Sequence, residues 1–257
     1  MHGANLIYDG TFDGFLSTVF TVYEQKLSNV TIQNETHSQS LLFAETEFIP
    51  TNETQAKRVW KGLIKHLTFR EASVVFYAFL SEQPNVENIL LDYIQYIFKN
   101  EKGAGEDFSH PSVLKIAQIA KQVGREKHRM EAFVRFRLTK DEIYFAGIEP
   151  DFNVLPLILS HFKKRYADQK WLIYDIKRKY GIYYDLHSVE MINIDFPDTF
   201  DFTKTDETYF SEAEFDFQKL WKSYFRSSNI EERKNMKLHI QHVPKRYWKY
   251  LSEKQPD

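Results

Sequence analysis

Residues 129–185 read RMEAFVRFRLTKDEIYFAGIEPDFNVLPLILSHFKKRYADQKWLIYDIKRKYGIYYD. Apolar residues alternate with polar or basic ones over 133–138, 171–175 and 181–185, which is the period of a β-strand. Residues 143–148 predict another strand, joined to the first by a turn around Lys140 and Asp141. A helix is expected between these strands, over residues 153–166. The stretch therefore predicts a small sheet, antiparallel or mixed, with a flanking helix.

The chain before residue 129 is predicted to be mainly helical. Asn5–Tyr8 forms a short opening strand that ends at the turn Asp9-Gly10, and residues 41–49 are extended. Apolar residues at helical spacing predict helices at about residues 11–26, 51–67, 70–80, 86–98 and 111–133.

After residue 185 the sequence predicts a further strand, at 189–194, and then an acidic loop over 195–207. Ser211 begins a helix to about Phe225, with Glu214 at capping-box spacing, and a basic, partly helical tail follows. The expected fold class is α+β: a helical N-terminal half, then a small antiparallel or mixed sheet with flanking helices. A soft boundary near residue 105 separates a mainly helical region 1–105 from an α+β region 106–257, unless the two form one continuous domain.

Composition excludes several classes of protein. The chain has 257 residues, 42% of them hydrophobic and 16% aromatic, and no cysteine. Disulfides, thiolate zinc sites, iron–sulfur clusters and cysteine nucleophiles within this chain are therefore excluded. His239 and His242 stand three apart without a third ligand nearby, so neither a metal nor another cofactor is expected. No secretory signal or membrane span is visible, which predicts a cytoplasmic protein.

Charge is segregated along the chain, although the net charge is only −2. Residues 121–137 and 161–185 each carry +4, and residues 233–254 carry +6. Residues 195–216 carry one basic and eight acidic side chains, a charge of −7. Basic segments interleaved with aromatic rings are typical of nucleic-acid binding, but they are equally expected of solvated helix faces.

On the binding interpretation, arginines and lysines meet phosphates, while rings stack on bases or pack the basic segments in place. The candidate residues are Arg125, Arg129, Arg135, Arg137, Arg165, Lys245 and Arg246 for phosphates, and Trp171, Tyr183, Tyr247 and Trp248 for bases.

An enzyme is the alternative hypothesis, with Glu149, His161 and Asp175 as its polar centre. A carboxylate at a strand end beside a histidine can act as an acid–base pair, but it can equally hold the Arg165 guanidinium. Ser109-His110-Pro111-Ser112 resembles a short motif of uracil-DNA glycosylases, yet it is also a good helix start. No phosphate-binding glycine loop, GxSxG or HExxH motif is present.

Several longer motifs resemble a bacterial family described as "probable DNA metabolism protein", a domain of unknown function. They are YDGTFDGF at 8–15, REKHRMEAFVRF at 125–136, IEP at 148–150, WLIYD at 171–175, GIYYD at 181–185 and PKRYW at 244–248. The resemblance covers nearly the whole chain.

The resemblance implies an accessory role in DNA repair or modification. Members of the family are typically encoded beside a radical S-adenosylmethionine (SAM) protein, and some are fused to a uracil-DNA glycosylase domain. DNA, the radical SAM protein and a glycosylase are therefore the expected partners, and a membrane is not. No reaction is established for the family, so the resemblance transfers no catalytic residue. A protein–protein adaptor is a third hypothesis, in which the acidic residues 195–216 and exposed rings dock the partner.

Overall fold

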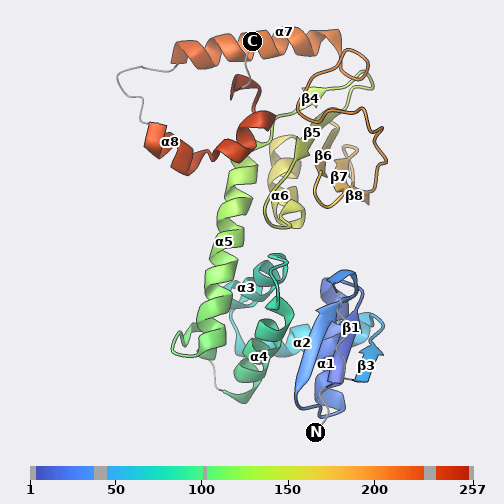
Figure 1. Cartoon of the computed structure of the whole chain (residues 1–257), viewed down its shortest axis with the longest axis vertical. Helices are drawn as coiled ribbons and strands as arrows, with labels where there is room; N and C mark the ends of the chain where they lie inside the picture. The colour runs from blue at the N-terminus through green and yellow to red at the C-terminus, as the bar shows by residue number, and fades with distance from the viewer. Residues whose placement is uncertain (1–3, 38–44, 101–102, 229–235, 255–257) are drawn as a thin grey trace. The chain divides into compact units, whose positions relative to one another are not determined.

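The computed structural model describes residues 4–37, 45–100, 103–228 and 236–254 (Figure 1). It confirms the α+β fold class. Contacts divide the chain into two compact units, Met1–Gly124 and Arg125–Asp257. This division falls inside a long helix, whereas the sequence expectation placed a soft boundary near residue 105. The first turns of that helix supply Val113, Ile116 and Ile119 to the core of the first unit. The boundary lies after residue 105 because this helix begins in the first unit and continues without a break into the second.

The first unit combines helices with a parallel sheet of strand order β2-β1-β3. Its strands are β1 (Ala4–Tyr8), β2 (Val30–Asn34) and β3 (Glu45–Phe48). Its helices are α1 (Phe12–Glu24), α2 (Glu53–His66), α3 (Phe69–Phe79), α4 (Val86–Lys99) and the first half of α5 (Pro111–Phe133). Short 3₁₀ turns occur at Glu35–His37 and Ala104–Glu106. The predicted helices are all present, and β2 is a strand that the sequence pattern did not suggest.

Side-chain caps fix where these helices begin. The Thr11 hydroxyl accepts a hydrogen bond from the Gly14 amide at 2.9 Å, immediately after the turn at Gly10, whose φ is +81°. The Asn52 side chain accepts from the amides of Thr54 and Gln55 at the start of α2. Thr68 and Glu71 form a reciprocal capping box at the start of α3. Each cap satisfies amide groups that lack partners within the helix.

The second unit is built on a mixed sheet of strand order β4-β5-β6-β7-β8. The strands are β4 (Arg137–Leu138), β5 (Tyr144–Ile148), β6 (Trp171–Asp175), β7 (Tyr180–Tyr184) and β8 (Val189–Ile192). Only β5 and β6 pair in parallel, and α6 (Leu155–Arg165) makes the crossover between them. The predicted hairpin of β4 and β5 is confirmed, but β4 is short because α5 continues through Phe133.

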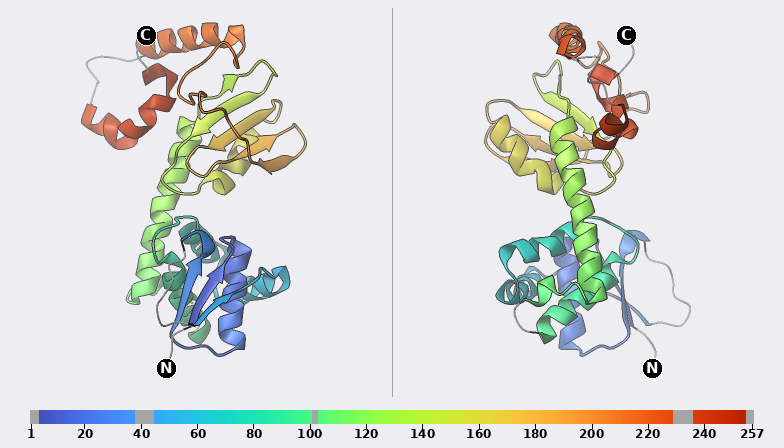
Figure 2. Two further views of the ribbon diagram at one scale, coloured as in Figure 1. Left: turned by 45° about the vertical axis from the view of Figure 1, so that its right-hand side comes forward. Right: turned by 90° about the vertical axis from the view of Figure 1, so that its left-hand side faces the viewer.

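Both faces of this sheet are covered (Figure 2). All five residues of β6 are buried, as expected of a central strand. On one face, Trp171 of β6 packs against Phe162 of α6 at 6.2 Å between ring centroids. On the other face, Tyr174 packs against Phe196 and Phe202 from the segment after β8. The acidic stretch 195–207 is a loop, as expected, but its phenylalanines belong to the core because they close the second face.

The rest of the second unit is helical, with α7 (Glu212–Ser228), α8 (Met236–His242) and 3₁₀ turns at Lys245–Tyr250 and Ser252–Lys254. Glu214 is buried on α7 and its carboxylate accepts hydrogen bonds from the Leu138 amide at 2.8 Å and from Gln218 at 2.9 Å. It thereby gives a backbone amide of the edge strand β4 a hydrogen-bond partner. Among the described helices, none has an apolar stretch long enough to cross a membrane.

Candidate functional site

The basic C-terminal segment, residues 236–254 in the described structure, is called the tail below, and Tyr247 holds it in place. This side chain is 2% exposed, and its ring centroid lies 5.6 Å from that of Phe133 on α5. Its hydroxyl donates a hydrogen bond to Glu126, which is itself 1% exposed. Burial and this hydrogen bond raise the pKa of Tyr247 above its ordinary value. Tyr247 is therefore a core residue and has no surface on which a base could stack.

Other tail residues bind carboxylates of the same unit. Arg246 lies 2.5 Å from Asp151, and Lys249 and the Tyr250 hydroxyl each lie 2.7 Å from Glu149. The hydrogen bonds from Lys249 and Tyr250 lower the pKa of Glu149. Arg246 and Lys249 thus already have an anion beside them.

Glu253 connects the tail to the end of α5 and to α7. Its carboxylate accepts from Arg135 at 2.8 Å and from the indole nitrogen of Trp221 at 3.0 Å. Burial opposes ionisation of Glu253, but the hydrogen bonds and charge of Arg135 outweigh that effect, so its pKa lies below the ordinary value. Arg135 is therefore already paired with a carboxylate of the same unit.

Two further candidates for nucleic-acid binding, Arg137 and Trp171, are buried. Arg137 donates to the carbonyl oxygens of Phe202, at 2.8 Å, and Lys204, and its guanidinium lies 4.5 Å from the Phe210 ring centroid. Burial lowers the pKa of Arg137 to about 10, which leaves it charged at neutral pH. Trp171 is 0% exposed and packs among Phe136, Phe162 and Tyr184. Trp171 is therefore closed to a ligand, and the Arg137 guanidinium is already occupied by backbone carbonyls.

The remaining candidates for nucleic-acid binding differ in solvent exposure and in whether a carboxylate lies beside them. Arg125, Arg165 and Lys245 are exposed, whereas Arg129 is half-buried and lies 3.4 Å from Glu126. Trp248 donates its indole N–H to the Val243 carbonyl at 3.0 Å, and Tyr183 packs against the core on the second face of the sheet. Among the described contacts, none pairs Arg125 or Arg165 with a carboxylate. Lys245 has no described carboxylate partner either, so these three cations are the binding candidates available to a phosphate.

The three enzyme candidates have separate partners. Asp175 is buried, pairs with Arg178 at 2.8 Å, and accepts from the Lys177 and Arg178 amides. Burial raises the pKa of Asp175. Glu149 binds the tail, as described above, and the Nδ1 atom of His161 lies 3.9 Å from Glu131. Of the three, only His161 lines the pocket described below, and the guanidinium held by Asp175 is that of Arg178, not Arg165.

The Ser109–Ser112 motif lies in the first unit at the start of α5. The Ser112 hydroxyl is 2.8 Å from His110 Nδ1, and the His110 ring stacks on Tyr96 at 3.9 Å. Ser109 donates to Asp107 at 2.5 Å. These contacts order the entry to a helix whose first residue is Pro111, as the sequence indicated.

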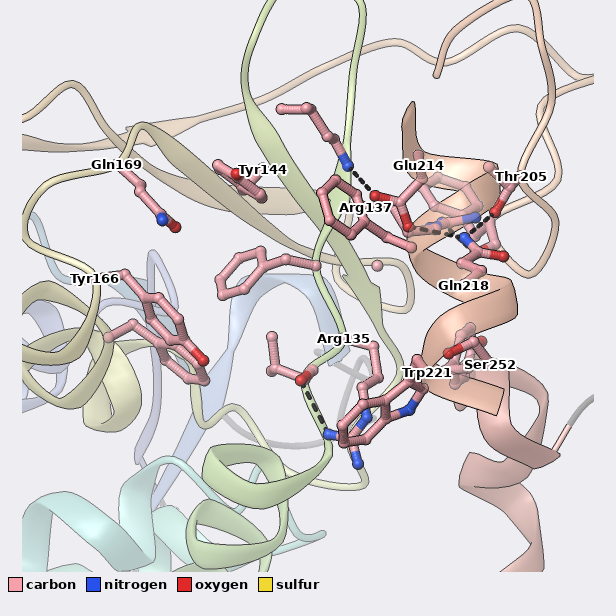
Figure 3. Close-up of a pocket in the computed structure, with 18 of the residues that line it drawn as sticks. Arg135, Arg137, Tyr144, Tyr166, Gln169, Thr205, Glu214, Gln218, Trp221 and Ser252 are labelled. Carbon is pink, nitrogen blue, oxygen red and sulfur yellow. Dashed lines mark hydrogen bonds between the residues drawn. The ribbon is translucent and has the colours of Figure 1, made fainter. Parts of the chain in front are cut away.

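A pocket of about 680 Å³ lies within the second unit, at the β4 edge of its sheet (Figure 3). Figure 3 shows Tyr144, Tyr166 and Gln169 on one side, and Arg137, Glu214, Gln218 and Trp221 on the other. The first side comes from β5, the end of α6 and the residues that follow it, and the second comes mainly from α7. This volume lies within the range of small-molecule sites.

The polar groups that line the pocket fall into two sets. Arg135, Arg137, Glu214 and the amide nitrogen of Gln218 are committed to intramolecular hydrogen bonds. In the described part of the chain, no hydrogen-bond partner is found for the side chains of Tyr144, Arg165, Tyr166 and Gln169. The first set makes the wall rigid, and the second set offers a cation, an amide and two hydroxyls to a ligand.

A family model matches residues 84–253 of the chain: DUF4130, a domain of unknown function. The protein belongs to this family. The match includes the whole described pocket and the tail that borders it. No curated protein matches the chain.

One solved structure to which the DUF4130 chain is similar is the pGpG-specific phosphodiesterase PggH from Vibrio cholerae. The two are 8% identical with a TM-score of 0.37, and the match covers 70% of this chain and 81% of that one.

Sequence reasoning identified four residues that line the pocket, Arg135, Arg137, His161 and Arg165, but it missed other polar groups there. Tyr144, Tyr166, Gln169 and Gln218 are ordinary residues without a motif, and they come from β5, the end of α6 and α7. One indirect signal in the sequence points to them. Tyr166 and Gln169 follow the basic end of α6, where the charge pattern makes Arg165 a candidate.

Proposed function

We propose that this DUF4130 protein binds nucleic acid through its second unit and acts as an accessory protein of DNA metabolism. The observation that carries the proposal is the pocket, because available aromatic, amide and cationic groups meet in it. Nucleic acids present the matching features: flat bases with polar edges and a phosphate beside each one.

Cations at the end of α6 supply the electrostatic part of this proposal. Lys163, Lys164 and Arg165 occupy the last turn, and Lys164 and Arg165 are exposed. Basic side chains at a helix C-terminus also favour the helix dipole, so their presence alone does not indicate a ligand. Binding is favoured because Arg165 lines a pocket whose Tyr144 and Tyr166 hydroxyls have no described hydrogen-bond partner.

The cellular role is inferred from the resemblance of the sequence motifs. It suggests DNA repair or modification together with a radical SAM protein, and in fused relatives a uracil-DNA glycosylase. Because this chain contains no cysteine, any iron–sulfur chemistry would belong to the partner. The chain would then present nucleic acid to a partner that performs the reaction.

The double substitution Lys164→Glu with Arg165→Glu tests nucleic-acid binding. We expect affinity for a single-stranded oligonucleotide to fall at least about tenfold at 0.1 M salt, because two phosphate contacts become repulsive. The slope of log affinity against log salt should decrease by about 1.4, measured by fluorescence anisotropy. The matched control is Lys61→Glu with Lys65→Glu on α2, which makes the same charge change on exposed lysines of the first unit. Equal losses in both variants, or no binding by the wild type, would contradict the proposal.

An adaptor is the second candidate function, and α7 is the observation that favours it. Phe217, Leu220, Trp221 and Tyr224 recur at helical spacing on one face of α7, and each is at least 39% exposed. The acidic residues 195–216 run up to and into this helix. An apolar helix face beside a strongly acidic segment suits a protein partner whose docking surface is apolar with a basic rim. On this candidate, that partner is the radical SAM protein.

Leu220→Asp tests the adaptor candidate without altering the pocket, whose lining does not include Leu220. We expect it to reduce co-purification of the radical SAM protein at least about tenfold, because a charge would be buried in the interface. Ser223→Asp, an exposed residue on the same helix, is the control and should retain the partner. Retention of the partner by Leu220→Asp would remove α7 from the interface.

A further inference from the structure

We infer that the pocket at the β4 edge holds a single unpaired nucleobase, with Arg165 binding the phosphate attached to it. This assignment rests on the proposed nucleic-acid binding and adds to it the part of the ligand that is recognised. Three features of the pocket support it: its shape, the side chains without a described hydrogen-bond partner, and the rigid wall opposite them.

The pocket suits a flat ring. Tyr144 and Tyr166 line one side and Trp221 lines the other, so aromatic rings lie on both sides (Figure 3). Tyr166 stacks on Phe162 at 6.0 Å and meets Phe136 edge to face at 5.3 Å. Trp221 is fixed through its indole N–H on Glu253. Rings that are already held by neighbours lose little freedom on binding, which favours stacking of a ligand.

The available polar groups suit the edge of a base. The Gln169 side chain offers a donor and an acceptor together, and the Tyr144 hydroxyl can do either. A nucleobase edge presents donors and acceptors side by side, which an amide can match in a bidentate way. Because no described residue satisfies the Gln169 amide, it is free to make this contact.

Arg165 supplies the anion-binding group of the same site. It lines the pocket and is exposed, and its guanidinium lies 5.8 Å from the Tyr166 ring centroid. A base stacked beside Tyr166 would therefore place its phosphate near a cation. Duplex DNA buries its base edges in pairing, so the ligand that fits is a single strand or a nucleotide extruded from a duplex.

Titration of the full chain with deoxynucleoside 5′-monophosphates tests this assignment. We expect saturable quenching of Trp221 fluorescence, which Trp221→Phe abolishes while calorimetry still detects binding. Deoxyribose 5-phosphate at the same concentrations should neither quench nor compete, because it lacks the base. Gln169→Leu, similar in size but without the amide, should weaken mononucleotide binding at least about tenfold, and Tyr144→Phe should weaken it about threefold.

The outcomes separate this inference from the function on which it rests. Gln118→Leu on α5 is the matched control and should bind mononucleotides like the wild type, since this exposed residue lies outside the pocket. Salt-dependent binding of oligonucleotides without any response to mononucleotides, and with unchanged binding by Gln169→Leu and Tyr144→Phe, would overturn the base site and leave nucleic-acid binding intact. Absence of oligonucleotide binding by the wild type, or equal losses in Lys164→Glu with Arg165→Glu and in Lys61→Glu with Lys65→Glu, would instead overturn the proposed function.

Discussion

Replacement of Tyr247 by alanine is expected to lower the free energy of unfolding of the second unit by about 3–5 kcal/mol. The substitution removes a buried ring that packs on Phe133 and leaves the buried carboxylate of Glu126 without its hydroxyl partner. Both losses act in the same direction, because a cavity and an unsatisfied charge are each costly in the interior.

Urea denaturation followed by tryptophan fluorescence measures this effect. The Trp60→Phe background leaves Trp171, Trp221 and Trp248, so that the signal reports the second unit. Tyr247→Phe keeps the ring and should cost only about 1–3 kcal/mol, which separates the hydrogen bond from the packing. Tyr224→Ala, at an exposed tyrosine of α7, should change stability by less than about 1 kcal/mol. A Tyr247→Ala midpoint equal to that of the wild type would show that the tail is not anchored here.

Arg137→Met is expected to destabilise the second unit by about 2–4 kcal/mol and to leave the salt dependence of oligonucleotide binding unchanged. Methionine fills a similar volume but cannot donate to the carbonyls of Phe202 and Lys204. It also removes the cation from the Phe210 ring and from the vicinity of buried Glu214. The loop that closes the second face of the sheet therefore loses its anchor.

Two measurements on the Arg137 variants distinguish an anchor from a phosphate contact. Arg137→Lys keeps the charge but not the planar fork, so its unfolding midpoint should lie between those of Arg137→Met and the wild type. Oligonucleotide titrations at several salt concentrations, under conditions where the variants are folded, give the salt slope. A lower slope together with wild-type stability would show that Arg137 meets phosphate after all.

Much of the fold follows from local sequence. Pro111 opens α5 and the helical spacing carries it to Phe133, and alternation locates β6 and β7. The strand β2 is missed because its alternation of apolar and polar residues is short, with Val30 and Ile32 as the only apolar members. The parallel pairing of β5 with β6 depends on the crossover of α6, which is a property of tertiary packing and not of either strand.

The candidate site was harder to predict, since charge and aromaticity look the same in a binding surface and in a buried network. Glu126 and Tyr247 are 121 positions apart, and Asp151 and Arg246 are 95 apart. No local pattern reveals such pairings. The motif at residues 244–248 is therefore occupied largely by anchoring residues, while Gln169 and Tyr144 of the pocket carry no sequence signature.

The ion pairs of the tail change how the molecule attracts an approaching polyanion. At long range each ion pair acts as a dipole, whose field decays faster than that of a single charge. The pairs are Arg246 with Asp151, Lys249 with Glu149, and Arg135 with Glu253. Salt screens what remains beyond about 8 Å at physiological ionic strength. Long-range steering, and with it the rate of encounter, therefore falls to cations without a nearby carboxylate, such as Arg125 and Arg165. Arg246 and Lys249 therefore add less to the capture of a ligand from solution than the charge of their segment suggests.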